Sequence, residues 1–167
     1  DNVVVNDSAL VGTKGEAYTS LQYAHDHATT ALCSQAVGAM ERAIEITTEY
    51  LRMRKQFGVP IGTFQALQHR LADMLIEMEQ ARIMVYRALS FAESDPVTRN
   101  LAVAAAKAQM GKAARFVGAQ AIQLHGGVGV TEEYSVGHYF KFFCVAENLF
   151  GNTAKNLHLL ASNLEVA

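Results

Sequence analysis

Cysteines and long apolar runs are scarce in this sequence, and each absence narrows the class of protein. The two cysteines, Cys33 and Cys144, lie far apart and lack the paired spacing of a zinc site or a disulfide framework. Reduced, buried cysteines are the ordinary alternative, so we expect a cytoplasmic protein or one of the mitochondrial matrix. No apolar run approaches the roughly 18 to 20 residues of a membrane-spanning helix. Residues 1–7 have no cationic region or cleavage site and do not resemble a signal peptide.

A strong charge of either sign is also missing. The formal net charge is −2 at pH 7, so no basic field is present to attract nucleic acid or anionic lipid, and neither is expected as a partner. An anionic substrate would need a local cationic site. The six histidines show no i, i+3 or i, i+4 pairing with one another, and no Glu-x-x-His pair occurs. We therefore expect no metal site, which argues against a di-iron carboxylate bundle.

The sequence is long enough for one domain, and its apolar residues follow a helical period. Half of the 167 residues are apolar, which is sufficient for a single core. Apolar side chains recur every three or four positions from Tyr18 to Arg54 and again from Thr63 to Ala92, which predicts two long helices. Between them, Phe57-Gly-Val-Pro-Ile-Gly62 contains two glycines and a proline and predicts a break.

A third helix is predicted from Pro96 to Leu124, with Asp95 as its N-cap and Pro96 in its first position. Its many alanines would let neighbours approach closely, so we place it in the middle of a bundle. Residues 135–144 and 152–164 predict a fourth, interrupted helix. The predicted fold class is all-α, an up-and-down four-helix bundle over residues 18–167, because short connections favour antiparallel neighbours. Residues 1–17, with a strand-like stretch at residues 3–5, are expected to come from a preceding β domain.

Two short segments carry residues that could bind a ligand. Three glycines follow His125 within four positions, and glycine lets the backbone approach a partner closely and turn its amides toward an anion. A helix-ending turn with Gly126 and Gly127 as the C-cap is the ordinary alternative. Arg54 and Lys55 close the first predicted helix, where cations commonly complement the helix dipole. Arg54 could instead hold a phosphate group through its parallel N–H donors.

Four motifs, taken in order, resemble the C-terminal helical domain of the acyl-CoA dehydrogenase family. They are Arg54-Lys-Gln-Phe-Gly58, Ile61-Gly-Thr-Phe-Gln65, Leu71-Ala-Asp-Met74 and Gln123-Leu-His-Gly-Gly-Val-Gly129. The resemblance extends over nearly the whole chain. It implies a four-helix bundle that belongs to a larger subunit, in which FAD lies between domains and across a subunit interface.

The resemblance also implies site residues, a cofactor and partners. The residues similar to those that contact FAD are Arg54, Gln56, Phe57, Gln65, Gln123, Gly126 and Gly127. The family desaturates acyl-CoA thioesters: the α hydrogen leaves as a proton, the β hydrogen passes to the flavin as hydride, and an acceptor such as electron-transfer flavoprotein takes the electrons. This bundle would contribute to FAD binding and to assembly into dimers or tetramers. By itself it would be inactive, because the other walls of the active site lie elsewhere.

The proton acceptor is the point at which this sequence departs from the family's pattern. Most members carry a glutamate in a Tyr-Glu-Gly-Thr stretch, and here Phe150 stands in its place. Some members carry it in the first helix, where this sequence has Ala28. Glu147 lies nearly one helical turn before Phe150 and is the candidate base, although such a helix residue is ordinarily exposed to solvent. Two more glutamates, Glu132 and Glu133, are expected to be loop-surface or capping residues.

Three hypotheses explain the missing carboxylate. The first is an acyl-CoA dehydrogenase that uses another base. The second is a non-catalytic subunit or helical assembly module paired with a paralogous dehydrogenase subunit, since residues 132–141 and Asn148-Leu-Phe-Gly151 resemble the small subunits of heteromeric, pimeloyl-type acyl-CoA dehydrogenases. The third is a flavin-dependent relative with different chemistry. Retention of the flavin-facing motifs without the proton acceptor favours the second over the third.

Overall fold

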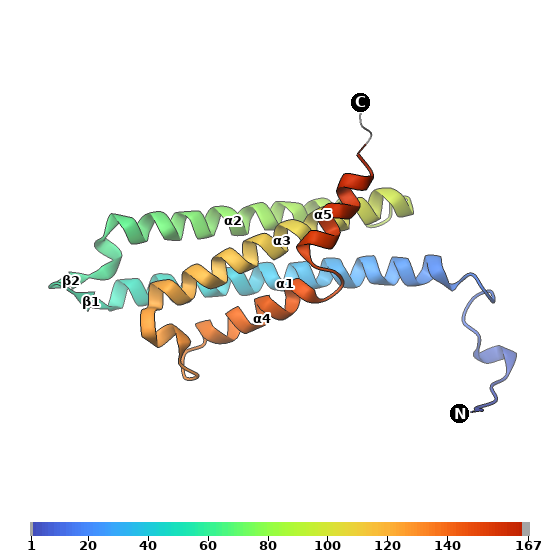
Figure 1. Ribbon diagram of the computed structural model, residues 1–167, viewed down its shortest axis with the longest axis horizontal. Helices are drawn as coiled ribbons and strands as arrows, with labels where there is room; N and C mark the ends of the chain where they lie inside the picture. Colours follow the sequence, from blue (N-terminus) through green and yellow to red (C-terminus); the bar gives the residue numbers. More distant parts are fainter. Residues whose placement is uncertain (1, 165–167) are drawn as a thin grey trace.

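The computed structural model describes residues 2–164, which form three long helices and two shorter ones (Figure 1). The long helices are α1 (Ala17–Met53), α2 (Gln65–Ser90) and α3 (Pro96–His125), and the shorter ones are α4 (Val136–Asn148) and α5 (Thr153–Ser162). Consecutive long helices are antiparallel, and α4 and α5 together take the place of a fourth helix. The predicted all-α up-and-down bundle is confirmed. The predicted entry segment, residues 1–17, and the predicted bundle, residues 18–167, include Asp1 and residues 165–167, which lie outside the described residues.

The first residues of the chain lead away from the bundle (Figure 1). They contain a short 3₁₀ helix, η1 (Asp7–Ala9), and are exposed throughout. Val3 to Val5 form no strand within this chain, so the strand-like pattern there is not realised. A strand needs a neighbour to pair its N–H and C=O groups, and the described residues supply none at this place. Assignment of residues 1–17 to a preceding β domain stays a prediction.

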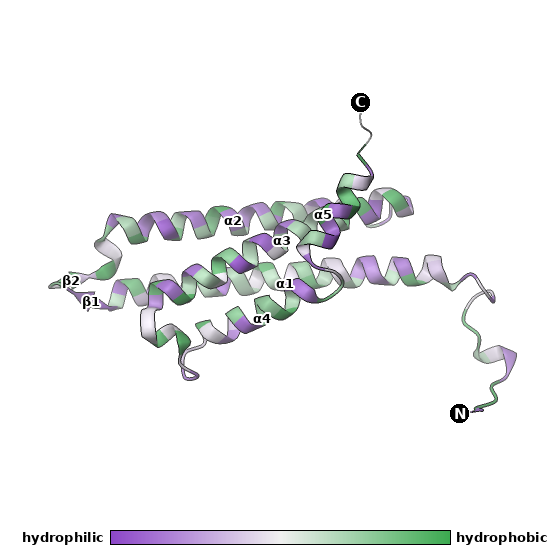
Figure 2. Cartoon of the chain, viewed as in Figure 1, coloured by the Kyte–Doolittle hydropathy of each residue, from purple (hydrophilic) through white to green (hydrophobic). Residues whose placement is uncertain are grey.

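The start of α3 follows the sequence prediction closely. The Asp95 side chain accepts hydrogen bonds from the Val97 and Thr98 amides, both at 3.1 Å, and Pro96 occupies the first turn. Hydrogen bonds from Thr98 lower the pKa of Asp95. The N-cap prediction is therefore confirmed. Hydrophilic and hydrophobic residues alternate along the helices (Figure 2).

The break between α1 and α2 contains a small hairpin that the sequence did not predict. Strand β1 (Lys55–Gln56) pairs antiparallel with β2 (Val59–Pro60), and a 3₁₀ turn, η2 (Ile61–Thr63), leads into α2. The Ile61 amide donates to the Arg54 carbonyl at 2.8 Å, which extends the pairing by one residue. The break was predicted correctly, but its strands are too short to show an alternating pattern.

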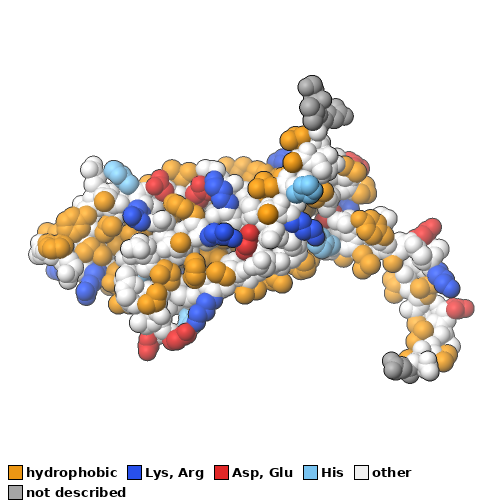
Figure 3. Space-filling model, in the orientation of Figure 1, with side chains coloured by type: hydrophobic (Ala, Val, Ile, Leu, Met, Phe, Trp, Pro, Cys, Tyr) orange, Lys and Arg blue, Asp and Glu red, His pale blue; other side chains and the backbone are white. Residues whose placement is uncertain are grey.

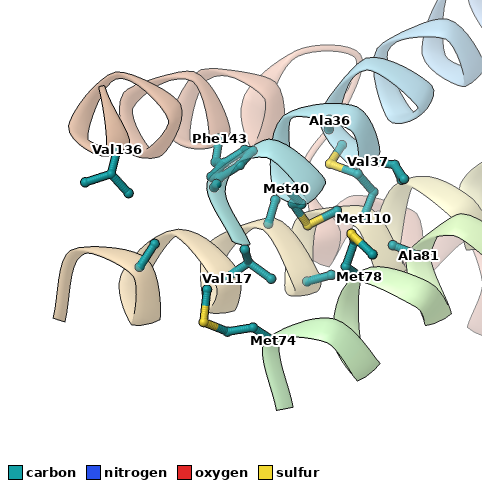
Figure 4. Packing of buried hydrophobic residues seen from close by; sticks show 14 of the residues in the cluster. Ala36, Val37, Met40, Met74, Met78, Ala81, Met110, Val117, Val136 and Phe143 are labelled. Carbon is teal, nitrogen blue, oxygen red and sulfur yellow. The ribbon is translucent and has the colours of Figure 1, made fainter. Parts of the chain in front are cut away.

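Methionine and alanine build most of the core, and α3 lies at its centre. Met40, Met74 and Met110 are fully buried and meet between α1, α2 and α3 (Figure 4). Methionine fills irregular gaps because its side chain is flexible. Helix α3 contacts α1, α2, α4 and α5, as expected for its alanine-rich sequence. Its fully buried alanines are Ala106, Ala113, Ala114 and Ala121.

Candidate functional site

The motifs of the glycine segment and the arginine segment meet at one end of the bundle. The C-terminal ends of α1 and α3 lie there with the start of α2 (Figure 1); residues 50–65 and 123–134 together are called the hairpin end below. The Tyr50 hydroxyl donates to the His125 carbonyl at 3.3 Å across 75 residues of sequence. The Tyr50 and His125 rings also stack with their centroids 4.5 Å apart. Folding therefore fixes the two segments relative to each other.

His125 packs in the core of the hairpin end. Its Nδ1 lies 2.7 Å from the Ala121 carbonyl, so Nδ1 carries the proton of the neutral ring. Its Nε2 is buried and has no hydrogen-bond partner within residues 2–164. Burial lowers the pKa of His125, because a second ring proton would be charged and unpaired. His125 is therefore a packing residue.

Gly126 ends α3 in a conformation that only glycine adopts readily, with φ 63° and ψ −143°. Its amide donates to the carbonyls of Ile122 and Gln123. That amide is therefore used within the chain and is not free for an anion, which corrects one part of the sequence hypothesis. Both Gly126 and Gly127 are exposed, and nothing lies within 4 Å of a Cβ built on either residue. Their contribution to a site is a bare surface that a partner can approach closely.

The hairpin turn holds an exposed aromatic ring. Phe57 and Gly58 have φ values of 54° and 83°, the pair of positive angles of a type I′ turn, which normally favours Asn-Gly. The Phe57 side chain is 90% exposed and meets the edge of Phe64 with ring centroids 6.1 Å apart. Such strain in a non-glycine residue costs of order 1 kcal/mol and is typical of functional sites.

Charge on the arginine segment of the hairpin end, residues 50–65, is positive only. Arg52, Arg54 and Lys55 are exposed, and none of them takes part in the ion pairs formed within residues 2–164. No acidic residue occurs between Glu49 and Asp73, and α3 carries none along its whole length. Hydrophobic side chains gather at this end of the molecule, with Lys or Arg side chains beside them (left of Figure 3). The amides of Gln56, Gln65 and Gln123 are exposed at the same end.

Phe150, which stands where the resemblance implies a base, lies far from the hairpin end, in the turn between α4 and α5. Phe150 has φ 58° and is 41% exposed. Its ring meets the His25 ring of α1 edge to face, with centroids 5.4 Å apart and an interplanar angle of 82°. Ala28, the other position for a base, follows His25 by three residues on α1 and is half-buried.

Glu147 is buried, so the expectation of an exposed helix residue is wrong. Its Oε1 accepts from the Thr153 amide and its Oε2 from the Thr153 hydroxyl, both at 3.0 Å. The fully buried Lys107 donates to the Glu147 and Ala146 carbonyls, each at 2.9 Å. A carboxylate can be buried when it is hydrogen-bonded near a cation, and these partners supply both conditions.

Glu147 and Phe150 also face different helices. A Cβ added at Gly111 of α3 would collide with the Glu147 carboxylate, and the Arg115 guanidinium lies 3.8 Å from it. A hollow of about 270 Å³ beside it is lined by α3 and α4 residues, whereas Phe150 lies against α1. Helix α4 ends at Asn148, so the helical spacing that would bring Glu147 to the space of Phe150 does not continue.

Glu132 and Glu133 lie on the surface, as the sequence predicts for loop or capping residues. Glu132 and Glu133 are exposed in the loop after the glycines, and Lys141 pairs with Glu132 at 2.6 Å, which lowers the pKa of Glu132. Within residues 2–164 no three His, Cys, Asp or Glu side chains lie close enough together to hold a metal ion. None of the helices in that range combines the length and apolar character of a membrane span.

The order of helices and the motifs at the hairpin end agree with a known family. Residues 18–165 match the family model described as "Acyl-CoA dehydrogenase, C-terminal domain". The chain belongs to the acyl-CoA dehydrogenase family. Acyl-CoA dehydrogenase IpdE2 of Mycobacterium tuberculosis is 40% identical over 116 residues, which cover 70% of this chain and 35% of that protein. The probable acyl-CoA dehydrogenase FadE25 of the same organism is 34% identical over 141 residues, which cover 84% and 36%.

Solved structures of acyl-CoA dehydrogenases have the same fold. Butyryl-CoA dehydrogenase from Megasphaera elsdenii superposes with a TM-score of 0.83 at 30% identity, over 90% of this chain and 39% of that one. A steroid acyl-CoA dehydrogenase, Tcur3481-Tcur3483, gives 0.82 at 35% identity, over 89% and 40%. The resemblance inferred from the motifs is confirmed. The chain spans little more than a third of the length of the curated relatives.

Proposed function

We propose that this acyl-CoA dehydrogenase C-terminal domain works within an FAD-dependent enzyme that desaturates acyl-CoA thioesters, and that its hairpin end contacts the FAD of a neighbouring subunit. The observation that carries the proposal is the hairpin end itself. It combines cations that form no ion pair within residues 2–164, an exposed strained phenylalanine and a bare glycine surface, and its acidic residues are confined to Glu132 and Glu133 in the loop after the glycines. Each of these features is unfavourable or unused in the chain alone.

The residues present fit the chemistry of a flavin dinucleotide. The Arg54 guanidinium can pair with phosphate oxygens through two parallel N–H groups. The Phe57 ring offers an apolar face and edge to a heterocycle. At Gly126 and Gly127 no side chain prevents close approach, and Gln56, Gln65 and Gln123 offer amide donors and acceptors. Arg52 and Lys55 add a positive potential that attracts an anionic cofactor.

In the proposed reaction, bound FAD would supply the acceptor for the β hydrogen, and this chain would supply position and shielding. The α hydrogen of a thioester is weakly acidic, so a base must take it in a site from which water is excluded. The apolar helices of the bundle would form one wall of that site. An electron acceptor such as electron-transfer flavoprotein, and assembly into dimers or tetramers, belong to the same proposal.

A non-catalytic subunit of a heteromeric dehydrogenase is the second candidate. It is favoured by Phe150 and Ala28, which leave both family positions for the base without a carboxylate. This candidate is also supported by the similarity of this chain to the ChsE4-ChsE5 complex from Mycobacterium tuberculosis. The two superpose with a TM-score of 0.79 at 31% identity over 86% of this chain. Flavin binding without reduction by acyl-CoA, restored by a co-purifying partner, would select this candidate.

The proposed FAD contact is tested by Gly127→Ala in the intact protein. Gly127 does not have a positive φ and a Cβ there meets nothing within 4 Å, so the variant should keep its melting temperature. The new methyl group would stand on the surface proposed to meet FAD, and we expect FAD affinity to fall at least about tenfold, equal to about 1.4 kcal/mol. Gly38→Ala is the matched control, because Gly38 is exposed in α1 with equally open space.

FAD affinity is measured by titrating the apoprotein and following flavin fluorescence. Loss of affinity in Gly127→Ala alone supports the contact. Equal affinity in both variants would show that FAD does not lie on the glycine surface.

A further inference from the structure

His25 lies next to both positions at which the resemblance implies a carboxylate, Phe150 and Ala28. Its ring meets the edge of Phe150 at a centroid distance of 5.4 Å. Ala28 follows it by three residues on α1, and residues with this spacing are neighbours on a helix surface, roughly 5–6 Å apart. The two positions come from opposite parts of the sequence, and folding brings both to the same imidazole.

The His25 side chain is available for chemistry. It is 45% exposed, on a face that the rest of this chain leaves open. Its ring nitrogens make no hydrogen bond within the described part of the chain, and Nδ1 lies 3.8 Å from a carboxylate oxygen of Asp26.

Three other titratable side chains of this part of the chain, Asp26, His27 and Glu147, have partners of their own. The Asp26 carboxylate accepts from Arg99 at 3.0 Å, from Asn100 at 3.2 Å and from Gln22 at 2.8 Å. His27 stacks on Tyr23 with ring centroids 4.1 Å apart, and its Nε2 lies 3.9 Å from Glu93. Glu147 is bonded to Thr153 on the α3 side. Lys155 lies beside Gly151 in the same turn, but a lysine ammonium group only donates hydrogen bonds, whereas a neutral imidazole has an acceptor nitrogen. His25 is therefore the acceptor shown in contact with Phe150.

We propose that His25 is the proton acceptor of this subunit, in place of the family's glutamate, with Phe150 as the wall that orients its ring. This inference depends on the proposed acyl-CoA oxidation. An imidazole nitrogen takes the α hydrogen as a proton, and the electron pair of that C–H bond becomes the new Cα=Cβ π bond. The β hydrogen leaves with its electron pair as hydride to the flavin, so two electrons pass from the thioester to FAD.

The test uses the intact protein with its bound FAD, together with any subunit that co-purifies. Two readouts are needed: the rate of flavin reduction by a saturated acyl-CoA, and deuterium uptake at Cα of an acyl-CoA with sulfur in place of the β methylene. The second ligand can lose its α proton but has no β hydrogen to donate, so it reports proton removal alone.

His25→Gln should slow both processes by at least about 100-fold, the lower range for loss of a general base, while FAD content and melting temperature stay unchanged. His27→Gln is the matched control and should leave both rates within about twofold. His25→Ala gives a second variant at the same position and should match His25→Gln. Phe150→Glu, added to His25→Gln, should recover at least about tenfold of the flavin reduction by restoring a carboxylate to the same space.

The outcomes separate this inference from the proposed function. If the unaltered protein reduces its flavin and exchanges the α hydrogen while both His25 variants remain within about threefold of it, the role of His25 is overturned and the proposed oxidation stands. If the unaltered protein, with its co-purifying partner, does neither with any acyl-CoA, the oxidation and the role of His25 fall together.

Discussion

Phe57 and Phe150 share an uncommon backbone conformation. Their φ values are 54° and 58°, and each precedes a glycine whose φ is also positive, at 83° for Gly58 and 96° for Gly151. A bulky residue in the left-handed region costs of order 1 to 3 kcal/mol, so both turns are strained. One turn lies in the proposed FAD contact, and the other holds Phe150 at the position where a base was expected.

Phe57→Asn should raise the melting temperature and weaken FAD binding together. Asparagine tolerates positive φ and Asn-Gly is favoured in a type I′ turn, so relief of strain should stabilise the domain by about 0.5–1 kcal/mol. Loss of the ring should lower FAD affinity if Phe57 contacts the cofactor. Scanning calorimetry and fluorescence titration measure the two effects. An increase in stability without change in affinity would remove Phe57 from the contact.

Glu147→Gln should affect stability more than chemistry. Glu147 holds Thr153 through two hydrogen bonds, and its carboxylate lies near the buried cation Lys107, whose pKa is lowered by burial. Removal of the negative charge should cost about 1–3 kcal/mol. We expect a lower melting temperature with flavin reduction per bound FAD within about twofold, using exposed Glu133→Gln as the control. A 100-fold loss of reduction at unchanged melting temperature would instead make Glu147 the base.

Arg99→Met should be strongly destabilising. Arg99 and Asp26 form a buried pair at 3.0 Å, and their side chains are 6% and 0% exposed. Removing one partner leaves the other charge buried, which typically costs about 3–5 kcal/mol. The control is Arg42→Met, because Arg42 pairs with Glu45 on the surface, where a pair contributes about 0–1 kcal/mol. Comparable melting temperatures for the two variants would mean that Asp26 and Arg99 do not form the buried pair.

Stability should fall in mild acid because of His125. Its pKa is lowered in the folded state by burial, so the unfolded chain binds a proton first as the pH drops below about 6.5. The stability from the neutral, buried ring is therefore complete above pH 6.5 and is lost below it, by up to about 1.4 kcal/mol per pH unit. His125→Phe should flatten the change in melting temperature between pH 7.5 and 5.5, whereas His69→Phe should not. Parallel curves for all three proteins would contradict this account of His125.

Sequence patterns predicted the parts of the fold that depend on local rules. The Asp95 cap and the apolar period of the long helices are such features, and the structure has both. The hairpin at β1 and β2 was missed because phenylalanine is not a residue that signals a turn with positive φ. The break before α5 was placed too early, since α4 continues to Asn148.

The environment of the candidate base depends on contacts between distant residues. Burial of Glu147 requires Lys107 of α3, and a lysine that is fully buried is rare enough that no sequence pattern predicts it. The approach of Phe150 to His25 joins the last turn of the bundle to its first helix. The motifs singled out the arginine and glycine segments that the fold brings together, and their contact with FAD stays a prediction. The surroundings of Glu147 and Phe150 required the folded chain.

A structure of the intact protein with FAD bound would test most directly whether the hairpin end contacts FAD. The account predicts FAD phosphate oxygens within about 3 Å of the Arg54 guanidinium of a neighbouring subunit, a hydrogen-bonding distance, with Gly127 in van der Waals contact with the cofactor. A structure in which Arg54 and Gly127 face only solvent or protein, with FAD bound elsewhere, would contradict it.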